Sequence, residues 1–116
     1  MYSTPDDMGQ WLKHLLADRS VTGRIAHGLY VQRGSIAGVE RFDAVGRADG
    51  IGLGWVHYEG GKILGKTGAH DGFATYIAFA PGGKAGVFGV MPTMDLEAQK
   101  RMAIAINQWI SKMEAR

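Results

Sequence analysis

The sequence contains no cysteine, so disulfides, cysteine-ligated zinc sites and thiol catalysis are excluded, while the redox compartment stays undecided. A long apolar run is also missing, because no stretch approaches the ~18–20 residues that a bilayer span needs. The N-terminal residues show neither the basic nor the apolar part of a signal peptide. Lysine and arginine form no basic run and the net charge is only +2, so the charge pattern of a nucleic-acid-binding protein is absent.

The sequence is rich in glycine, with 18 glycines among 116 residues. This is about twice the share of an average protein. The glycines follow no collagen-like period, and they therefore predict turns and close approaches of the backbone. A chain of this length can form one small domain with a modest core. No internal repeat, low-complexity tract or linker divides residues 1–116.

A helix is predicted at the start of the chain, over residues 5–17. Thr4 is suited to cap it, and Pro5 is suited to its first position. Its apolar residues recur at helical spacing on one face, namely Met8, Trp11, Leu12, Leu15 and Leu16. With no segment before it in this sequence, we expect this face to be exposed and to favour a homo-oligomer or poor solubility.

A second helix is predicted at the end of the chain, over residues 95–112. Its apolar stripe consists of Met102, Ile106, Trp109, Ile110 and Met113. This helix can cover one face of a sheet. Because Trp11 and Trp109 lie on helical apolar stripes, both are predicted to be core residues rather than binding residues.

Between the helices, β-branched and aromatic residues predict strands separated by short turns. The strands are predicted over residues 52–58, 63–67, 73–80 and 85–91. The turns fall at 59–62 and 81–84. Residues 18–50 are predicted to be mostly irregular, with a short helix or strand within 25–31. The predicted fold class is α+β, an antiparallel meander of three to four strands with an N-terminal and a C-terminal helix.

The triplet Lys66-Thr67-Gly68 lies at the end of a predicted strand, and on its own it is a weak motif because its residues are common. Residues 60–67, GGKILGKT, also match the phosphate-binding pattern G-x-x-x-x-G-K-[ST] letter for letter. A P-loop must lead from its lysine into a helix. Here Gly68, Gly72 and a β-prone run follow instead, so nucleotide binding is rejected.

Four segments match one protein family in order and spacing. Residues 66–81, KTGAHDGFATYIAFAP, resemble the stretch K-T-G-x-x-x-G-F-x-x-y-i-a-f-x-P of serine β-lactamases and penicillin-binding proteins. Residues 2–8, 51–56 and 86–91 resemble three further segments of these proteins. The resemblance covers almost the whole chain except about residues 20–48. It is closest to class C β-lactamases and to the D-alanyl-D-alanine carboxypeptidase/endopeptidase branch.

Two motifs of that family are missing from the sequence, since neither Ser-x-x-Lys nor Tyr-x-Asn occurs. Gly65 also stands where many class C enzymes have a polar residue before the lysine. The resemblance thus implies a single partial domain, residues 1–116, from the C-terminal part of a β-lactamase-like α/β fold. Such a chain carries the substrate strand without the nucleophile, and by itself it cannot perform acyl-serine chemistry.

The resemblance implies roles for four residues. Lys66 would stabilise the substrate carboxylate and the charge of the active site, and Thr67 would donate a hydrogen bond to the substrate. Gly68 would leave room for a substrate backbone along the strand edge, and the backbone N–H of Ala69 would donate to the oxyanion hole. The implied partners are peptidoglycan stem peptides or β-lactams, in the periplasm, with no cofactor and no metal.

His70 and Asp71 follow the triplet, but neighbours on an extended chain point to opposite faces and would not share a ligand. The four histidines show no ligand-like spacing. These two residues are therefore predicted to form a polar rim. Two functions stay open. The chain is either a part of a serine hydrolase that is inactive alone, or a self-standing α+β module that binds a ligand or partner with its strand edge.

Overall fold

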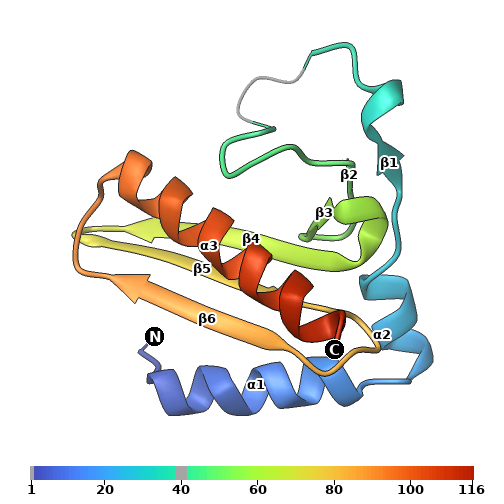
Figure 1. The fold of residues 1–116 in the computed structure, drawn as a ribbon, viewed down its shortest axis with the longest axis horizontal. Helices are drawn as coiled ribbons and strands as arrows, with labels where there is room; N and C mark the ends of the chain where they lie inside the picture. The colour runs from blue at the N-terminus through green and yellow to red at the C-terminus, as the bar shows by residue number, and fades with distance from the viewer. Residues whose placement is uncertain (1, 39–41) are drawn as a thin grey trace.

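The computed structural model describes residues 2–38 and 42–116, in which a single antiparallel sheet carries a helix on each face (Figure 1). The helices are α1 (Pro5–Ala17), α2 (Val21–Ala26) and α3 (Leu96–Glu114), with the 3-10 turns η1 (Arg33–Ser35) and η2 (Glu59–Gly61). The strands are β1 (Val31–Gln32), β2 (Gly50–Ile51), β3 (Val56–Tyr58), β4 (Ile63–His70), β5 (Phe73–Phe79) and β6 (Gly86–Met91).

The sheet is a meander in which the six strands lie in sequence order, each antiparallel to the next. The α+β class and the meander are confirmed, but the expected number of three to four strands is wrong. The two additional strands, β1 and β2, are two residues long and pair Val31 with Ile51 and Gln32 with Gly50. A two-residue strand has no alternating pattern to detect, so only the pairing between distant segments reveals it.

Both long helices form close to their predicted ranges. The hydroxyl of Thr4 accepts a hydrogen bond from Asp7 N at 3.1 Å, and α1 has the predicted bounds. Asp95 caps α3 by accepting from the backbone N–H groups of Glu97 and Ala98, and the helix runs two residues beyond the predicted end. Within the described ranges, no helix is long and apolar enough to cross a membrane.

The core is divided between the two faces of the sheet. On one face, α3 packs against β4, β5 and β6, and on the other α1 packs against β5 and β6. Side chains of β5 alternate between these cores, with Tyr76 toward α3 and Phe79 toward α1. Leu12 and Leu15 of α1 are buried in the core on its own side, so the expectation that the apolar face of this helix is exposed is wrong for these two residues. The sheet itself supplies the partner surface.

The long segment between α1 and the central strands is more ordered than predicted. Arg33 makes a two-pronged ion pair with Asp43, with both N–O distances at 2.6 Å, and Nη1 of Arg33 also donates to the Ala48 carbonyl. The hydrogen bonds from Arg33 lower the pKa of Asp43 to about 2. The pair fixes the loop that returns the chain to β2. Residues 39–41, within the stretch predicted to be irregular, lie outside the described residues.

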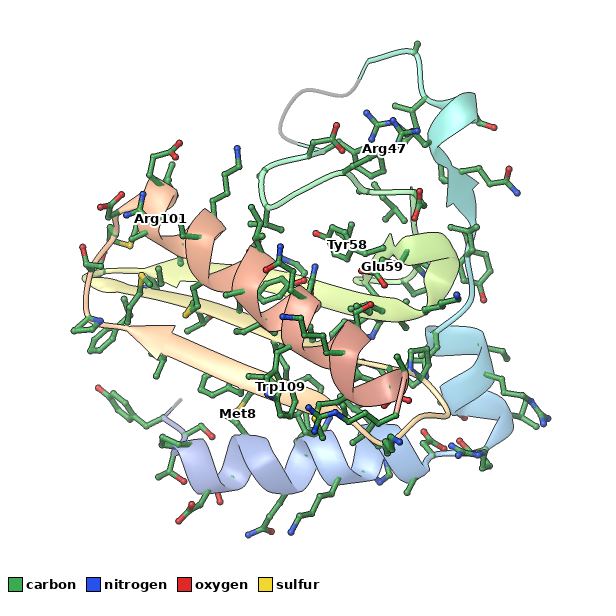
Figure 2. All side chains as sticks on the ribbon, in the orientation of Figure 1. Met8, Arg47, Tyr58, Glu59, Arg101 and Trp109 are labelled. Carbon is green, nitrogen blue, oxygen red and sulfur yellow. The ribbon has the colours of Figure 1, made fainter. Side chains whose placement is uncertain are left out.

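The prediction that Trp11 and Trp109 are core residues is wrong for both side chains. Trp11 of α1 is 43% exposed and Trp109 of α3 is 48% exposed. Figure 2 labels Trp109 on α3, and it labels Met8 on α1, the helix that carries Trp11. The two helical stripes are wider than the surfaces they cover, so the tryptophan at the margin of each stripe stays in contact with solvent.

Candidate functional site

The Lys66-Thr67-Gly68 triplet lies in the middle of β4 rather than at its end, because β4 continues to His70. A strand therefore follows Thr67 where a P-loop requires a helix. On one side, β5 pairs with β4 up to the pair His70–Phe73. On the other side, β3 stops pairing at Gly65. From Lys66 onward, no described strand occupies that edge of β4 (Figure 1).

A pocket of about 400 Å³ opens beside the triplet, on the face of the sheet that carries α1. Its lining comes from α1, from the turn before β3 and from β4, β5 and β6: Met8, Trp11, Leu53, Gly54, Trp55, Lys66, Thr67, Gly68, Thr75, Ile77 and Phe88. The pocket is mostly apolar, and the residues of the triplet form one wall together with Thr75. Such a surface suits a ligand with an apolar body and a few polar groups.

The two tryptophans of this pocket lie close together. The ring centroids of Trp11 and Trp55 are 6.1 Å apart, and Trp55 meets Phe79 edge to face at 5.1 Å. Trp55 is buried, whereas Trp11 is partly exposed at the pocket. Helical spacing predicts the wrong environment for Trp11 because it identifies the face of a helix but not how far the opposing surface extends.

All three residues of the triplet line this pocket. Lys66 is exposed and its Nζ donates to the Thr67 carbonyl at 2.7 Å, so the ammonium group lies next to its own strand. Thr67 is half-buried. A Cβ on Gly68 would lie 2.5 Å from Oγ1 of Thr75. A side chain at position 68 would therefore require the Thr75 hydroxyl to move, in addition to any need for room along the edge.

Ala69 follows the triplet on the same open edge, is exposed, and pairs with Ala74 of β5. The carbonyl of Gly68 belongs to the peptide unit that contains the Ala69 N–H. It accepts hydrogen bonds from Oγ1 of Thr75 at 3.3 Å and from Nε2 of Gln99 at 2.9 Å. Sequence reasoning does not single out Gln99. The signal that could have identified this residue is its polar side chain on the stripe of α3 that faces the core. The buried residues of this helix are Gln99, Ala103, Ile106 and Ile110.

The glycine before Lys66 has a structural explanation. A Cβ on Gly65 would overlap the hydroxyl of Tyr76, which donates to Oδ1 of Asn107 at 2.8 Å. Tyr76 is fully buried, and burial raises the pKa of its hydroxyl. The bulky ring, in the core under α3, thus occupies the space that a side chain at position 65 would need.

His70 and Asp71 stand at the turn between β4 and β5, with side chains 91% and 99% exposed. Nδ1 of His70 lies 3.8 Å from Oδ2 of Asp71. In the part of the chain that the structure describes, no group of three or more His, Cys, Asp or Glu residues could hold a metal ion. The two residues form an exposed rim beyond the triplet.

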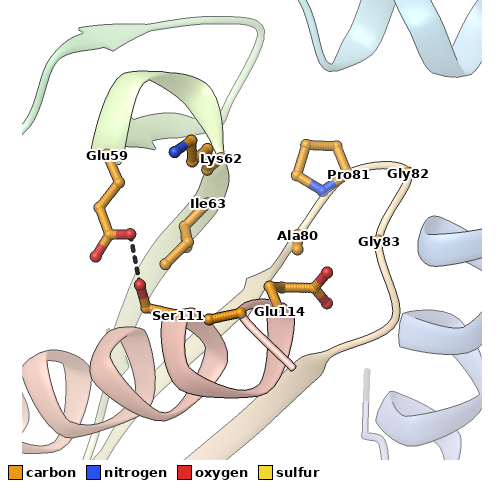
Figure 3. A pocket seen from close by; sticks show the side chains of 10 residues that line it. Glu59, Lys62, Ile63, Ala80, Pro81, Gly82, Gly83, Ser111 and Glu114 are labelled. Atoms are coloured by element: carbon orange, nitrogen blue, oxygen red, sulfur yellow. Dashed lines mark hydrogen bonds between the residues drawn. The ribbon is translucent and has the colours of Figure 1, made fainter.

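A larger pocket, of about 510 Å³, lies at the opposite end of β4 (Figure 3). Its polar groups already have structural partners. Oγ of Ser111 donates to Glu59 at 2.8 Å, and Oε1 of Glu114 accepts from the backbone N–H groups of Lys84 and Ala85 at 2.7 Å each. These contacts hold the end of α3 to η2 and to the β5–β6 hairpin, so this pocket is explained by packing.

Comparison with known proteins extends over nearly the whole chain. The chain is 36% identical to the D-alanyl-D-alanine-carboxypeptidase/endopeptidase AmpH of Escherichia coli K12 over 97% of its length, and equally to the protein of that name from E. coli O157:H7. The chain is therefore homologous to this carboxypeptidase/endopeptidase over almost all of its own length. No protein-family model matches it.

The fold of the chain also matches a solved structure. A crystal structure of a β-lactamase/D-alanine carboxypeptidase from Yersinia pestis, complexed with citrate, superposes with a TM-score of 0.79 at 33% identity over 95% of the chain. The chain spans 31% of AmpH and 34% of the Yersinia protein. About two thirds of each relative therefore has no counterpart in this sequence.

Proposed function

We propose that this chain forms the substrate-binding wall of a serine hydrolase that acts on peptides ending in D-Ala-D-Ala or on β-lactams. The observation that carries the proposal is the position of Lys66, Thr67 and Gly68 on an open strand edge beside a mostly apolar pocket. The identity to a carboxypeptidase/endopeptidase supports the choice of substrate. In this proposal the chain corresponds to the C-terminal part of such an enzyme.

Each polar group of the wall has a role in this proposal. The side chains of Lys66 and Thr67 leave the open edge of β4 on opposite faces. In this proposal the substrate carboxylate lies at that edge, between the ammonium group and the hydroxyl, and accepts charge-assisted hydrogen bonds from both. The backbone N–H of Ala69 donates to the carbonyl oxygen as it becomes negative. Because the sequence has no Ser-x-x-Lys and no Tyr-x-Asn, the chain binds ligand but forms no acyl-enzyme. Its substrates are peptidoglycan stem peptides, in the periplasm.

Ligand binding tests the proposal directly. An N-acyl-D-Ala-D-Ala dipeptide is titrated into the chain while tryptophan fluorescence is recorded, because Trp11 and Trp55 line the pocket. We expect Lys66→Ala to abolish the response by removing the charge beside the carboxylate. Lys62→Ala is the matched control, since Lys62 is a lysine at the other end of β4, away from the triplet. Equal binding by both variants would refute the assignment of Lys66.

A second candidate function is a non-enzymatic module that binds extended peptides along the open edge of β4. Binding of the dipeptide amide distinguishes this function from the proposed one. Strand addition uses backbone hydrogen bonds and is indifferent to a C-terminal carboxylate. The proposed function requires the free carboxylate, so the amide should not bind. A fluorescent penicillin provides the complementary measurement, and covalent labelling of the 116-residue chain would contradict its proposed inactivity.

A further inference from the structure

A buried glutamine connects the C-terminal helix to the backbone of the triplet. Gln99, in the first turn of α3, is 5% exposed. Its Nε2 donates to the carbonyls of Gly68 and Thr75, both at 2.9 Å. A side-chain amide nitrogen has two hydrogens, so the donor capacity of Gln99 is fully used. Gly68 and Thr75 face each other across β4 and β5, and one side chain therefore holds both strands at the triplet.

The geometry of the peptide bond gives this contact a consequence at the next residue. The Gly68 carbonyl and the Ala69 N–H belong to the same peptide unit, which is planar and trans, so the two groups point in opposite directions. The Gly68 carbonyl is engaged by Gln99 and by the hydroxyl of Thr75, a residue of β5. Holding this carbonyl fixes the rotation of the whole unit and so the direction of the Ala69 N–H.

A different polar contact of the same helix provides the comparison. Asn107 accepts from the hydroxyl of Tyr76 at 2.8 Å. It also joins α3 to the sheet, but it does so between two side chains and leaves the backbone of the triplet untouched. Docking of the helix would be served by either contact, whereas only Gln99 acts on the Gly68–Ala69 peptide unit.

We propose that Gln99 is a positioning residue that orients the Ala69 N–H toward the ligand-binding edge of β4. This inference rests on the proposed function, because that function makes the Ala69 N–H a donor to the substrate carbonyl. In this proposal, α3 covers the core on its face of the sheet and also sets the direction of the Ala69 N–H, the donor to the oxyanion.

The test uses the isotope-labelled chain and the variant Gln99→Met, which keeps the length of the side chain and removes both donors. The carbonyl ¹³C shift of Gly68 and the amide ¹⁵N shift of Ala69 report the hydrogen bonding and rotation of the peptide unit. We expect both to change in Gln99→Met and to stay at their wild-type values in Asn107→Leu. Equal shifts at Ala69 in these two variants would overturn the inference, because a general loosening of α3 would then explain them.

Gln99→Glu keeps the test decisive if the methionine variant does not fold. An ionised carboxylate cannot donate to the two carbonyls, whereas the protonated acid donates one hydrogen bond. The Ala69 shift in this variant should therefore approach the wild-type value as the pH falls and the introduced carboxylate becomes protonated. A shift that is independent of pH in Gln99→Glu would count against the positioning role.

Dipeptide binding separates this inference from the proposed function. We expect Gln99→Met to bind N-acyl-D-Ala-D-Ala roughly fivefold more weakly than the wild type, the scale of one lost hydrogen bond. If the wild-type chain does not bind the dipeptide, the proposed function fails, while the shift measurements still decide whether Gln99 orients the peptide. If the variant binds as well as the wild type despite a changed Ala69 shift, the positioning role is refuted.

Discussion

Adding a single methyl group at Gly65, directly before Lys66, tests how closely β4 packs against the core under α3. In Gly65→Ala the new Cβ would overlap the Tyr76 hydroxyl and lie 2.7 Å from Cζ and 3.0 Å from Cε1 of the same ring. The ring cannot move away easily, because Tyr76 is fully buried and its hydroxyl is bound to Asn107. The strand or the ring must therefore shift.

The expected cost follows from these contacts. Overpacking a core by one methyl group destabilises a protein by ~1–3 kcal/mol. The lower entropy of alanine in the unfolded chain offsets only ~0.4–1 kcal/mol of this. We expect Gly65→Ala to lower the free energy of unfolding by about 1–2 kcal/mol, net of these two effects. With a typical urea slope of ~1–3 kcal/mol per molar, the midpoint of unfolding should fall by roughly 1 M.

A double-mutant cycle identifies the cause. Tyr76→Phe alone loses the hydrogen bond to Asn107, at a cost of about 1 kcal/mol. In the Gly65→Ala background the same change also removes the oxygen that overlaps the new methyl group. We expect the double variant to be more stable than the sum of the single effects by about 1 kcal/mol, within the range for contacting residues. Urea unfolding followed by tryptophan fluorescence measures all four proteins. Single effects that add within ~0.3–0.5 kcal/mol would refute the overlap.

Two further predictions concern the stability of the fold. Gly9 lies within α1 and a Cβ there would meet nothing within 4 Å, so Gly9→Ala should raise the free energy of unfolding by ~0.5–1 kcal/mol in the same urea assay; a loss of stability would show an unrecognised contact. Burial lowers the pKa of His57 from its ordinary 6.5, against a smaller raising contribution from the Gly28 backbone. The unfolded chain then binds the proton more readily, so stability is present in full above about pH 6.5 and decreases as the pH falls toward the lower folded-state pKa. His57→Phe should flatten this part of the curve of melting temperature against pH, and an unchanged slope would exclude His57 as its source.

Local sequence patterns predicted the regular elements of the chain. Helical periodicity located α1 and α3, and the capping residue Thr4 marked the start of α1, because caps and amphipathic stripes are properties of residues close together in the sequence. Strand-forming runs and turn residues located β3, β4, β5 and β6, but the strand predicted over 52–58 is too long, because residues 52–55 form a turn and β3 begins at Val56. The same reasoning failed for β1 and β2, whose two residues each become strands only by pairing across the long segment that the Arg33–Asp43 ion pair organises.

By itself, the sequence determined the two long helices, the four longer strands, the family resemblance and the triplet at 66–68, since each is encoded in a contiguous run. Only the tertiary structure decided what surrounds them. It showed that β3 ends its pairing at Gly65 and leaves the triplet on an open edge, and that Trp11 lies at the pocket rather than in the core. It also placed Gln99 on the Gly68 carbonyl, 31 residues away along the chain. Contacts at this separation depend on how the helix and sheet pack, which no local pattern records.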